Sequence, residues 1–314
     1  MGQKKDFLIL KTELKQPKCR FCGSGPSHQS IKGEYVFGGK PEQRFWKCNV
    51  CQIIYLYPPP SKEEELEFYK KEFEKYMETR SGGDKDWSSP EKHFDSNQNE
   101  TIRRMSFLEP YLEKGQKALE IGCSSGFMLS ALRNKGVDVF GIDPSEGFIE
   151  YVRSKGIYVY KDLEELKANH DIQFDLIVHY YVLEHIRNPG DFIDQWMKLL
   201  KREGKMVFEV PCATDPLIEL YQVAAFDRFY WSCAHHWYFN QNSLTSLIKK
   251  TGYRFKLYPE QRYDLSNHMI WMQQGKPGGL GHYSRIFGDK LDRLYKQKLK
   301  EHWLCDTIIA LVEI

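Results

Sequence analysis

The chain has 314 residues, of which 41% are hydrophobic and 28% charged, enough for one large domain and a smaller one. Its formal net charge of +2 does not favour a polyanionic partner. No apolar run approaches the roughly 20 residues of a membrane span, so we expect no such span. The apolar stretch at residues 7–10 is too short for a signal peptide.

Four of the eight cysteines form two Cys-x-x-Cys pairs near the N-terminus, namely Cys19, Cys22, Cys48 and Cys51. Each pair aims two thiolates at one point, and two pairs complete a tetrahedral site for Zn²⁺. Strands are expected at residues 35–37 and 44–47. The pattern predicts a zinc-ribbon domain over residues 1–57, and the alternative is four unrelated cysteines. Four thiolates leave no open coordination position, so we expect the zinc to be structural. Cysteines used for metal rather than disulfides indicate a reducing compartment, which predicts a cytoplasmic protein.

Residues 58–112 are expected to form a helical linker. Three prolines at positions 58–60 give a stiff connector. Ser61 and Glu64 then form a capping box, which predicts that a helix begins there and runs over residues 62–79. A second helix is expected from about residue 90 to 112.

The central unit is a strand, a glycine turn, a helix and a second strand over residues 118–142, ending at Asp143. Such a unit offers backbone N–H groups and a helix N-terminus to a ligand, and a carboxylate to ribose hydroxyls. A dinucleotide fingerprint would need glycine where Ser124 stands. Glu120, at the end of the first strand, would repel a pyrophosphate and suits a cationic cofactor such as S-adenosylmethionine (SAM). The alternative is a Rossmann-type domain that binds NAD or no cofactor.

With this unit the chain resembles the class I SAM-dependent methyltransferases, from about Tyr111 to the C-terminus. The resemblance implies an α/β fold, a Rossmann-like sheet with helices on both faces, over residues 113–314. It also implies a SAM site that contains Glu120, Gly122, Cys123, Ser124, Gly126, Asp143 and Pro144.

Further cofactor contacts follow from the same resemblance. In the family, an acid after the third strand contacts the adenine amino group while the neighbouring backbone holds the ring, which points to Asp162 and Leu163. The end of the fourth strand lies beside the methyl group, which points to His179. Helices before the core cover the cofactor, which points to Tyr76. Asp162 could instead cap a helix, and Tyr76 could be a packing residue.

Residues 174–186, FDLIVHYYVLEHI, are similar to the fourth motif of many small-molecule methyltransferases. Enzymes that methylate the amino group of adenine or guanine usually carry Asn/Asp-Pro-Pro-Tyr/Phe at this place, so we do not expect a nucleic-acid substrate. His185 is a candidate catalytic base, with a packing role as the alternative.

An aromatic-rich insert at residues 212–240 follows the fifth strand, where family members build the substrate pocket. Its segment from His235 to Phe239 resembles the H-x-x-Y-F segment of sugar methyltransferases. This implies a sugar or sugar-nucleotide substrate and catalytic roles for His235, His236 and Tyr238. The family's preceding Tyr-x-Glu-His is replaced by Ser-Cys-Ala-His here, so both O- and C-methylation stay open. One of the two adjacent histidines could instead pack inside.

The remaining chain predicts a helix at residues 242–251, a strand at 253–258 and an amphipathic helix at 284–300. The last strand of the sheet is expected at either 265–273 or 304–314. The sequence as a whole predicts a SAM-dependent methyltransferase. The alternatives are an RNA methyltransferase that grips RNA with its zinc ribbon, and a SAM-binding protein without catalysis. The oligomeric state stays open.

Overall fold

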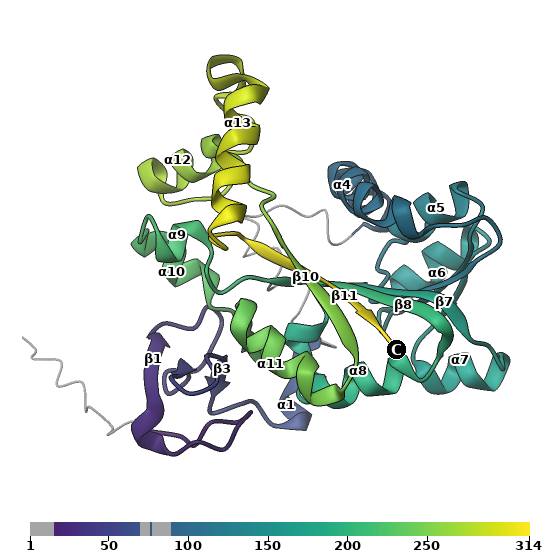
Figure 1. Ribbon diagram of the computed structural model, residues 1–314, viewed down its shortest axis with the longest axis horizontal. Helices are drawn as coiled ribbons and strands as arrows, with labels where there is room; N and C mark the ends of the chain where they lie inside the picture. Colours follow the sequence, from purple (N-terminus) through teal and green to yellow (C-terminus); the bar gives the residue numbers. More distant parts are fainter. Residues whose placement is uncertain (1–15, 70–75, 77–88) are drawn as a thin grey trace, which may run out of the picture.

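The computed structural model describes residues 16–69, 76 and 89–314, and a seven-stranded sheet forms its centre (Figure 1). The strand order is β10-β11-β8-β7-β4-β5-β6. Strands β4 to β8 run parallel, whereas β11 lies antiparallel between β8 and β10. The strands are β4 (Lys117–Ile121), β5 (Asp138–Ile142), β6 (Tyr158–Tyr160), β7 (Phe174–Tyr180), β8 (Leu200–Pro211), β10 (Arg254–Glu260) and β11 (Thr307–Glu313). The expected Rossmann-like α/β fold is confirmed.

Helices cover both faces of this sheet, and each face has its own apolar core (Figure 1). One face carries α4 (Gln98–Leu108), α5 (Phe127–Asn134) and α6 (Glu146–Ser154). The other carries α7 (Leu163–Asn169), α8 (Pro189–Met197) and α11 (Gln241–Thr251). The strands are buried on both sides, which is why their sequences are near-continuous apolar runs.

A second, four-stranded antiparallel sheet joins the N-terminal segment to the insert. Its order is β1 (Gln29–Gly33), β2 (Arg44–Cys48), β3 (Ile54–Tyr57) and β9 (Trp237–Tyr238). The strand expected at residues 35–37 is wrong, because β1 lies earlier and Phe37 forms only an isolated bridge to Ser232. Phe45, Trp231 and Tyr238 are fully buried in a third core between this sheet and the insert helices α9 (Pro216–Glu219) and α10 (Ala224–Tyr230). Residues far apart in sequence therefore share one core.

Helical segments precede the large sheet. Helix α1 (Lys62–Glu67) begins with the expected capping box, in which Glu64 N donates to Ser61 Oγ at 3.1 Å. Most of the rest of the predicted helix lies outside the described residues. The helix expected at 90–112 is interrupted at Asn97, which separates α3 (Pro90–Ser96) from α4, and a 3₁₀ turn (Glu109–Tyr111) follows.

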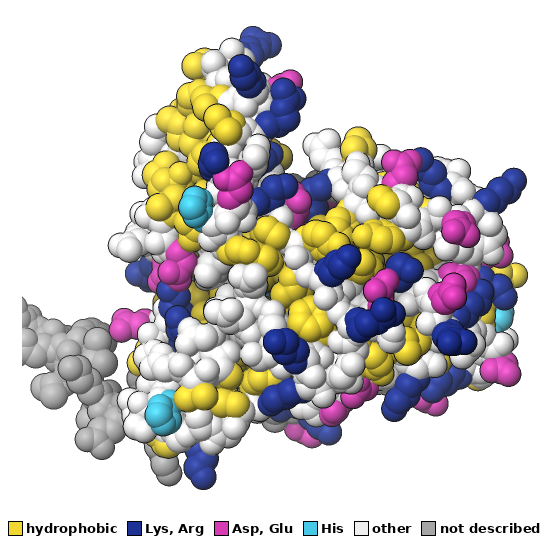
Figure 2. Space-filling view, viewed as in Figure 1, with side chains coloured by type: hydrophobic (Ala, Val, Ile, Leu, Met, Phe, Trp, Pro, Cys, Tyr) yellow, Lys and Arg dark blue, Asp and Glu magenta, His cyan; other side chains and the backbone are white. Residues whose placement is uncertain are grey.

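Two helices between β10 and β11, α12 (Leu265–Gln274) and α13 (Ser284–Glu301), form an arm that projects from the body (Figure 1). The sequence left 265–273 and 304–314 open as the last strand: the first is helical and the second contains β11. Helix α13 was expected to be amphipathic, and Leu299 on it is buried. Ile286, Leu291 and Leu294 are exposed, and hydrophobic side chains gather on the arm in Figure 2. Among the described residues, no helix is both long and apolar enough to span a membrane.

Candidate cofactor and acceptor site

The turn after β4 has the geometry of a ligand cradle. Gly122 and Gly126 have φ of +72°, and Ser124 has φ of +43°, all in the left-handed region that glycine adopts most easily. A Cβ added to Gly122 would lie 2.8 Å from Val182 Cγ2, so the turn packs closely on the segment after β7. Gly126 is the N-cap of α5, which leaves the positive end of that helix dipole facing the turn.

Asp143, at the end of β5, braces this turn. It is buried, and its two carboxylate oxygens accept hydrogen bonds from Ser124 N at 2.7 Å and Ser145 N at 2.9 Å. Burial raises the pKa of Asp143, and these two N–H donors oppose the rise. Each oxygen retains a further lone pair, so the carboxylate can also accept hydrogen bonds from a ligand's hydroxyl groups.

Glu120, at the end of β4, is buried beneath the turn. Its Oε2 has no hydrogen-bond partner among the residues that the structure describes. Burial raises the pKa of Glu120 to about 8, although the nearby Arg104 charge opposes the rise. A cationic ligand beside this carboxyl group would favour its ionised form.

Helices α3 and α4 cover the turn from above. His93 Nδ1 lies 2.8 Å from Ser125 Oγ, which places α3 directly over the glycine turn. The Arg104 guanidinium lies 4.0 Å from the centre of the Tyr180 ring, a cation–π contact at the end of β7. Neither residue was predicted from the sequence, because each stands in an ordinary helical segment.

A buried ionic network fixes α4 to the sheet. Arg103 Nη2 lies 2.7 Å from Glu209 Oε2, and Thr307 Oγ1 donates to Glu209 Oε1 at 2.7 Å. Arg104 Nε contacts the same Glu209 oxygen at 3.4 Å. Burial alone would raise the pKa of Glu209, but the two arginines lower it to about 2. Glu209 was not predicted, although an acid inside the apolar strand β8 was a signal for such a network.

The other predicted cofactor residues have varied environments. Cys123 is buried under the turn, and Pro144 is exposed. Asp162 is exposed and caps α7 by accepting a hydrogen bond from Glu165 N at 2.9 Å, while Leu163 packs in the core. The helix-cap alternative for Asp162 is therefore observed, and its contact with adenine stays a prediction.

His179 and Tyr76 have packing partners. The His179 ring is fully buried and stacks on Phe208 at a centroid distance of 4.8 Å, and burial lowers the pKa of His179 to about 3, which keeps it neutral. Tyr76 contacts Ser232 through its hydroxyl and Phe37 through its ring, both near the four-stranded sheet. Their cofactor contacts stay predictions.

Three chemically active side chains meet just after β7. Glu184 and His185 lie in the 3₁₀ turn η5 (Leu183–His185), and His235 comes from the insert. One ligand atom from each lies within 4.8 Å of the others. The rings of His185 and His235 are 4.7 Å apart and nearly perpendicular, and Tyr69 O–H lies 2.9 Å from His185 Nδ1. Burial raises the pKa of Glu184 to about 8. The structure thus brings together the two predicted bases His185 and His235 and adds Glu184, which was not predicted.

His236 points away from this cluster into an ionic chain. Its Nε2 lies 2.7 Å from Glu65 Oε1, and its Nδ1 lies 3.5 Å from the Arg20 guanidinium. Burial and the charges of Arg20 and Arg187 lower the pKa of His236 to about 3. A neutral ring fits these contacts when Nε2–H donates to Glu65 and Nδ1 accepts from Arg20. Both nitrogens are then occupied, so His236 suits a positioning role better than that of a base.

Tyr238 is a core residue of the four-stranded sheet. It is 1% exposed, its hydroxyl accepts from Ser232 N at 3.0 Å, and it donates to the Tyr230 carbonyl. Because these bonds occupy the hydroxyl, we leave Tyr238 out of the chemistry proposed below.

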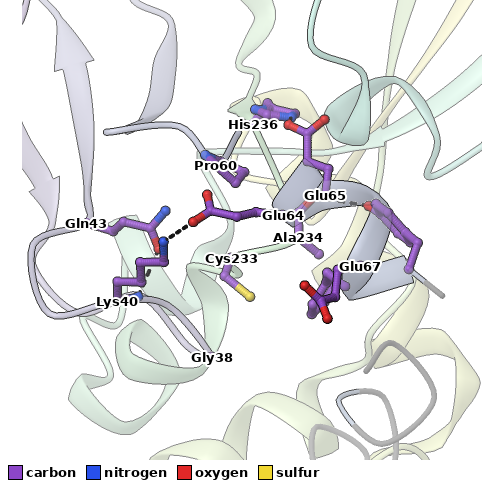
Figure 3. Close-up of a pocket in the computed structure, with 12 residues that line it drawn as sticks. Gly38, Lys40, Gln43, Pro60, Glu64, Glu65, Glu67, Cys233, Ala234 and His236 are labelled. Atoms are coloured by element: carbon purple, nitrogen blue, oxygen red, sulfur yellow. Dashed lines mark hydrogen bonds and ion pairs between the residues drawn. The ribbon is translucent and has the colours of Figure 1, made fainter. Parts of the chain in front are cut away.

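A pocket opens between the N-terminal segment, α1 and the insert (Figure 3). Lys40, Glu64, Glu65, Cys233, Ala234 and His236 are among the residues that line it. The Lys40–Glu64 ion pair crosses one side, and Glu65 meets His236 at another (Figure 3). The pocket also reaches Tyr69, so it borders the cluster of Glu184, His185 and His235.

The four N-terminal cysteines converge. The Sγ atoms of Cys19 and Cys51 are 3.7 Å apart, as are those of Cys22 and Cys48, and all four lie within 4.8 Å of one another. Tetrahedral zinc with Zn–S bonds of about 2.3 Å requires sulfurs about 3.8 Å apart. The residues fit a four-thiolate zinc site.

Comparison with known proteins agrees with this geometry. A family model described as "Methyltransferase domain" matches residues 91–256, more than half of the chain. The curated "Ubiquinone biosynthesis O-methyltransferase" of Methylococcus capsulatus is 31% identical over 113 residues, covering 33% of this chain and 48% of that protein. The protein of the same name from Idiomarina loihiensis is 26% identical over 131 residues, 39% and 54% of the two chains. The matched part thus spans about half the length of these relatives.

Solved structures give a further likeness. A SAM-dependent methyltransferase from Archaeoglobus fulgidus has a TM-score of 0.48 at 18% identity, covering 76% of this chain and 98% of that one. The plantazolicin methyltransferase BamL, in complex with a desmethyl analogue and SAH, has a TM-score of 0.44 at 14% identity, covering 76% and 97%. The match of the family model over more than half of the sequence shows that the chain belongs to the methyltransferase domain family.

Proposed function

We propose that the chain is a SAM-dependent methyltransferase that transfers a methyl group to a hydroxyl group of a small-molecule acceptor. The observation that carries the proposal is the cradle at the ends of β4 and β5. There, a left-handed glycine turn, a helix N-terminus and the buried Asp143 and Glu120 surround one position.

The chain's residues fit SAM at this position. Asp143 would accept hydrogen bonds from the ribose hydroxyls, and Glu120 would balance the positive charge of the sulfonium and amino groups. The glycine turn lets the cofactor approach the backbone closely. When bound, SAM supplies the electrophilic methyl group. Glu120 also disfavours a pyrophosphate at the same position, which is the main argument against NAD.

The acceptor would enter from the pocket between the N-terminal segment and the insert. Glu184, His185 and His235 lie between that pocket and the cradle, since η5 follows β7 and Val182 touches Gly122. We assign these three residues to activation of the acceptor hydroxyl. His236 and Glu65 would hold the pocket wall in place.

Two classes of small molecule are candidates for the acceptor. The H-x-x-Y-F segment supports a sugar or sugar nucleotide. The names of the relatives support O-methylation of a precursor in ubiquinone biosynthesis. Hydroxyl methylation is common to both, so we favour O- over C-methylation. The missing Tyr-x-Glu ahead of His235 also weakens the case for C-methylation.

We further propose that Cys19, Cys22, Cys48 and Cys51 hold one structural Zn²⁺. The sulfur distances support this, and the small N-terminal sheet gains stability from such a site. The zinc would fix the turn that carries Arg20 and hence the wall at His236. We expect this site to hold one zinc after dialysis against zinc-free buffer, measured by atomic emission, and to lose it in Cys22→Ser.

The experiment that tests the function uses purified protein and methyl-labelled SAM. Sugar nucleotides, lipid-extractable small molecules and total RNA from cells are supplied separately, and the label in each fraction is counted. Label in either small-molecule fraction supports the proposal and selects the acceptor class. Label in RNA alone would contradict it and would make the zinc ribbon an RNA-binding element. SAM binding without transfer to any fraction would favour a non-catalytic role.

A further inference from the structure

We propose that Glu184, His185 and His235 form a second metal site, distinct from the four cysteines, that binds one divalent transition-metal ion beside the cofactor cradle. The inference rests on the proposed function, because the ion would hold the acceptor oxygen. Sequence spacing gives no hint of this site, since the third ligand comes from the insert, which the helix α8 and the strand β8 separate from η5.

The buried carboxylate is the first argument. Glu184 is 0% exposed, and within the described part of the chain neither of its oxygens has a hydrogen-bond partner. An unpaired buried carboxyl group costs several kcal/mol unless a cation or donor compensates it. Glu209 shows the contrast: it is equally buried, but Arg103 and Thr307 satisfy its oxygens. The Arg262 charge favours the ionised form of Glu184 from a distance, but among the described residues no cation contacts its oxygens, and a bound metal ion would supply that contact.

The orientation of His185 is the second argument. Its Nδ1 lies 2.9 Å from the Ala234 carbonyl oxygen, which can only accept, so Nδ1 carries the proton. The phenol of Tyr69 lies at the same distance from Nδ1. Nε2 then carries the lone pair, the form in which histidine binds a metal. A backbone carbonyl that fixes the second nitrogen is the usual support of a metal-binding histidine.

The position of His235 is the third argument. Its backbone N–H donates to Ser232 O at 3.0 Å, and its ring lies between those of His185 and Tyr238. The neighbouring His236 N donates to the Glu184 carbonyl oxygen at 2.8 Å, which ties the insert to η5. The two histidines and the carboxylate are thus held together by backbone contacts, before any ion binds.

Two imidazoles and one carboxylate suit Zn²⁺, Mn²⁺ or Fe²⁺ and leave coordination positions open. The adjacent pocket, through Tyr69 and Ala234, gives an acceptor access to such a position. An ion there would lower the pKa of the acceptor hydroxyl, whose proton passes to water. The oxygen lone pair then forms the new O–C bond, and the electron pair of the S–CH₃ bond stays with the cofactor sulfur.

The test is metal stoichiometry of the full chain. Wild type and variants are dialysed against buffered Zn²⁺, and zinc per chain is measured by mass spectrometry. Binding of Mn²⁺, which prefers oxygen and nitrogen ligands to thiolates, is followed on the zinc-loaded protein by electron paramagnetic resonance. Glu184→Gln and His235→Ala remove ligands. Glu67→Gln, which changes an exposed carboxylate at the pocket, is the matched control.

We expect two zinc ions per wild-type and Glu67→Gln chain, and one in each ligand variant. If the second site does not hold Zn²⁺, one Mn²⁺ should bind to the zinc-loaded wild type. The ligand variants should weaken this Mn²⁺ affinity by about 10–100-fold or more. SAM affinity, measured without added metal, should stay unchanged, which shows that the variants are folded. One zinc and no Mn²⁺ in wild type, or metal binding unaffected by both variants, would overturn the proposal. Loss of SAM binding by wild type would instead contradict the proposed function and leave the metal count readable.

Discussion

The two sheets of this molecule differ in how far apart in the sequence their neighbouring elements lie. The cofactor part of the large sheet is local: β4, the glycine turn, α5 and β5 follow one another within residues 117–142. The four-stranded sheet is non-local, because β3 pairs with β9 of the insert, far along the chain. The first holds the proposed cofactor site, and the second forms one wall of the proposed acceptor pocket. The chemistry would occur where the two meet, at η5.

This difference predicts that the two regions can be damaged separately. We expect the largest effect from removing the N-terminal metal. Cys22→Ser with Cys48→Ser should abolish zinc binding at the four-cysteine site, and the binding free energy of structural zinc in isolated zinc-finger peptides is about 10–16 kcal/mol. Hydrogen exchange should show β1–β3 and β9 losing protection while β4 and β5 keep theirs. Methyl transfer should be lost, with the SAM dissociation constant changed less than about threefold. Equal loss of protection in both sheets would refute the separation.

The next effect concerns the ionic network under the large sheet. Glu209→Gln leaves Arg103 and Arg104 without their buried counter-charge and should lower the free energy of unfolding by about 3–5 kcal/mol. Urea unfolding measures this. Glu313→Gln, at the other end of the sheet in a partly exposed pair with Lys205, serves as the control and should cost less than about 1 kcal/mol.

The pKa of Glu209 also predicts how the free energy of unfolding depends on pH. Its folded pKa is about 2, against about 4.3 for an unfolded glutamate, so folding favours the ionised form. The stabilisation is present above about pH 4.3 and is lost as the pH falls toward 2. The wild-type and Glu209→Gln unfolding curves should therefore converge in acid. Parallel curves down to pH 2 would contradict the network.

A smaller effect should appear in the number of protons released on SAM binding, not in the stability of the fold. Glu120 has a pKa of about 8 in the free protein, so at pH 7 it is mostly protonated. A sulfonium beside it should lower that pKa, and SAM binding should release close to one proton. Calorimetry in buffers with different ionisation enthalpies measures the number. Glu120→Gln should abolish the release, and SAH, which lacks the sulfonium charge, should release less. Equal release by SAH and SAM would argue against the charge-balancing role.

The smallest effect belongs to Asp162. As the N-cap of α7 it should contribute about 1 kcal/mol to stability, lost in Asp162→Ala. If it only caps the helix, SAM affinity stays the same. A tenfold weaker SAM affinity would support the adenine contact that the family resemblance implies.

The cofactor side of the molecule could be predicted from the sequence more fully than the acceptor side. The apolar runs, the glycines and Asp143 predicted the cradle because all of its parts lie in one supersecondary unit. Antiparallel β11 could not be chosen over residues 265–273 from the sequence, since both segments are rich in apolar residues and only their packing separates them. The segment at 35–37 has strand-like residues, yet Phe37 forms an isolated bridge with Ser232 of the insert in place of a strand.

The acceptor side was predicted in part. His185 and His235 were named separately, but their meeting depends on β9 pairing with β3, which no local pattern encodes. Glu184 gave no signal of its own, because an acid in a 3₁₀ turn is usually exposed. The two adjacent histidines of the insert have opposite surroundings: His236 joins the Arg20–Glu65 chain, and His235 faces His185.

The most direct test of the central claim is SAM binding by titration calorimetry on wild type, Asp143→Ala and Asp138→Ala. The two acids flank the same strand, one at the cradle and one exposed at the opposite end. We predict one SAM per wild-type chain, at least about tenfold weaker binding by Asp143→Ala, and an unchanged affinity for Asp138→Ala. Wild type that binds no SAM, or an Asp143→Ala variant that binds it as tightly, would contradict the account.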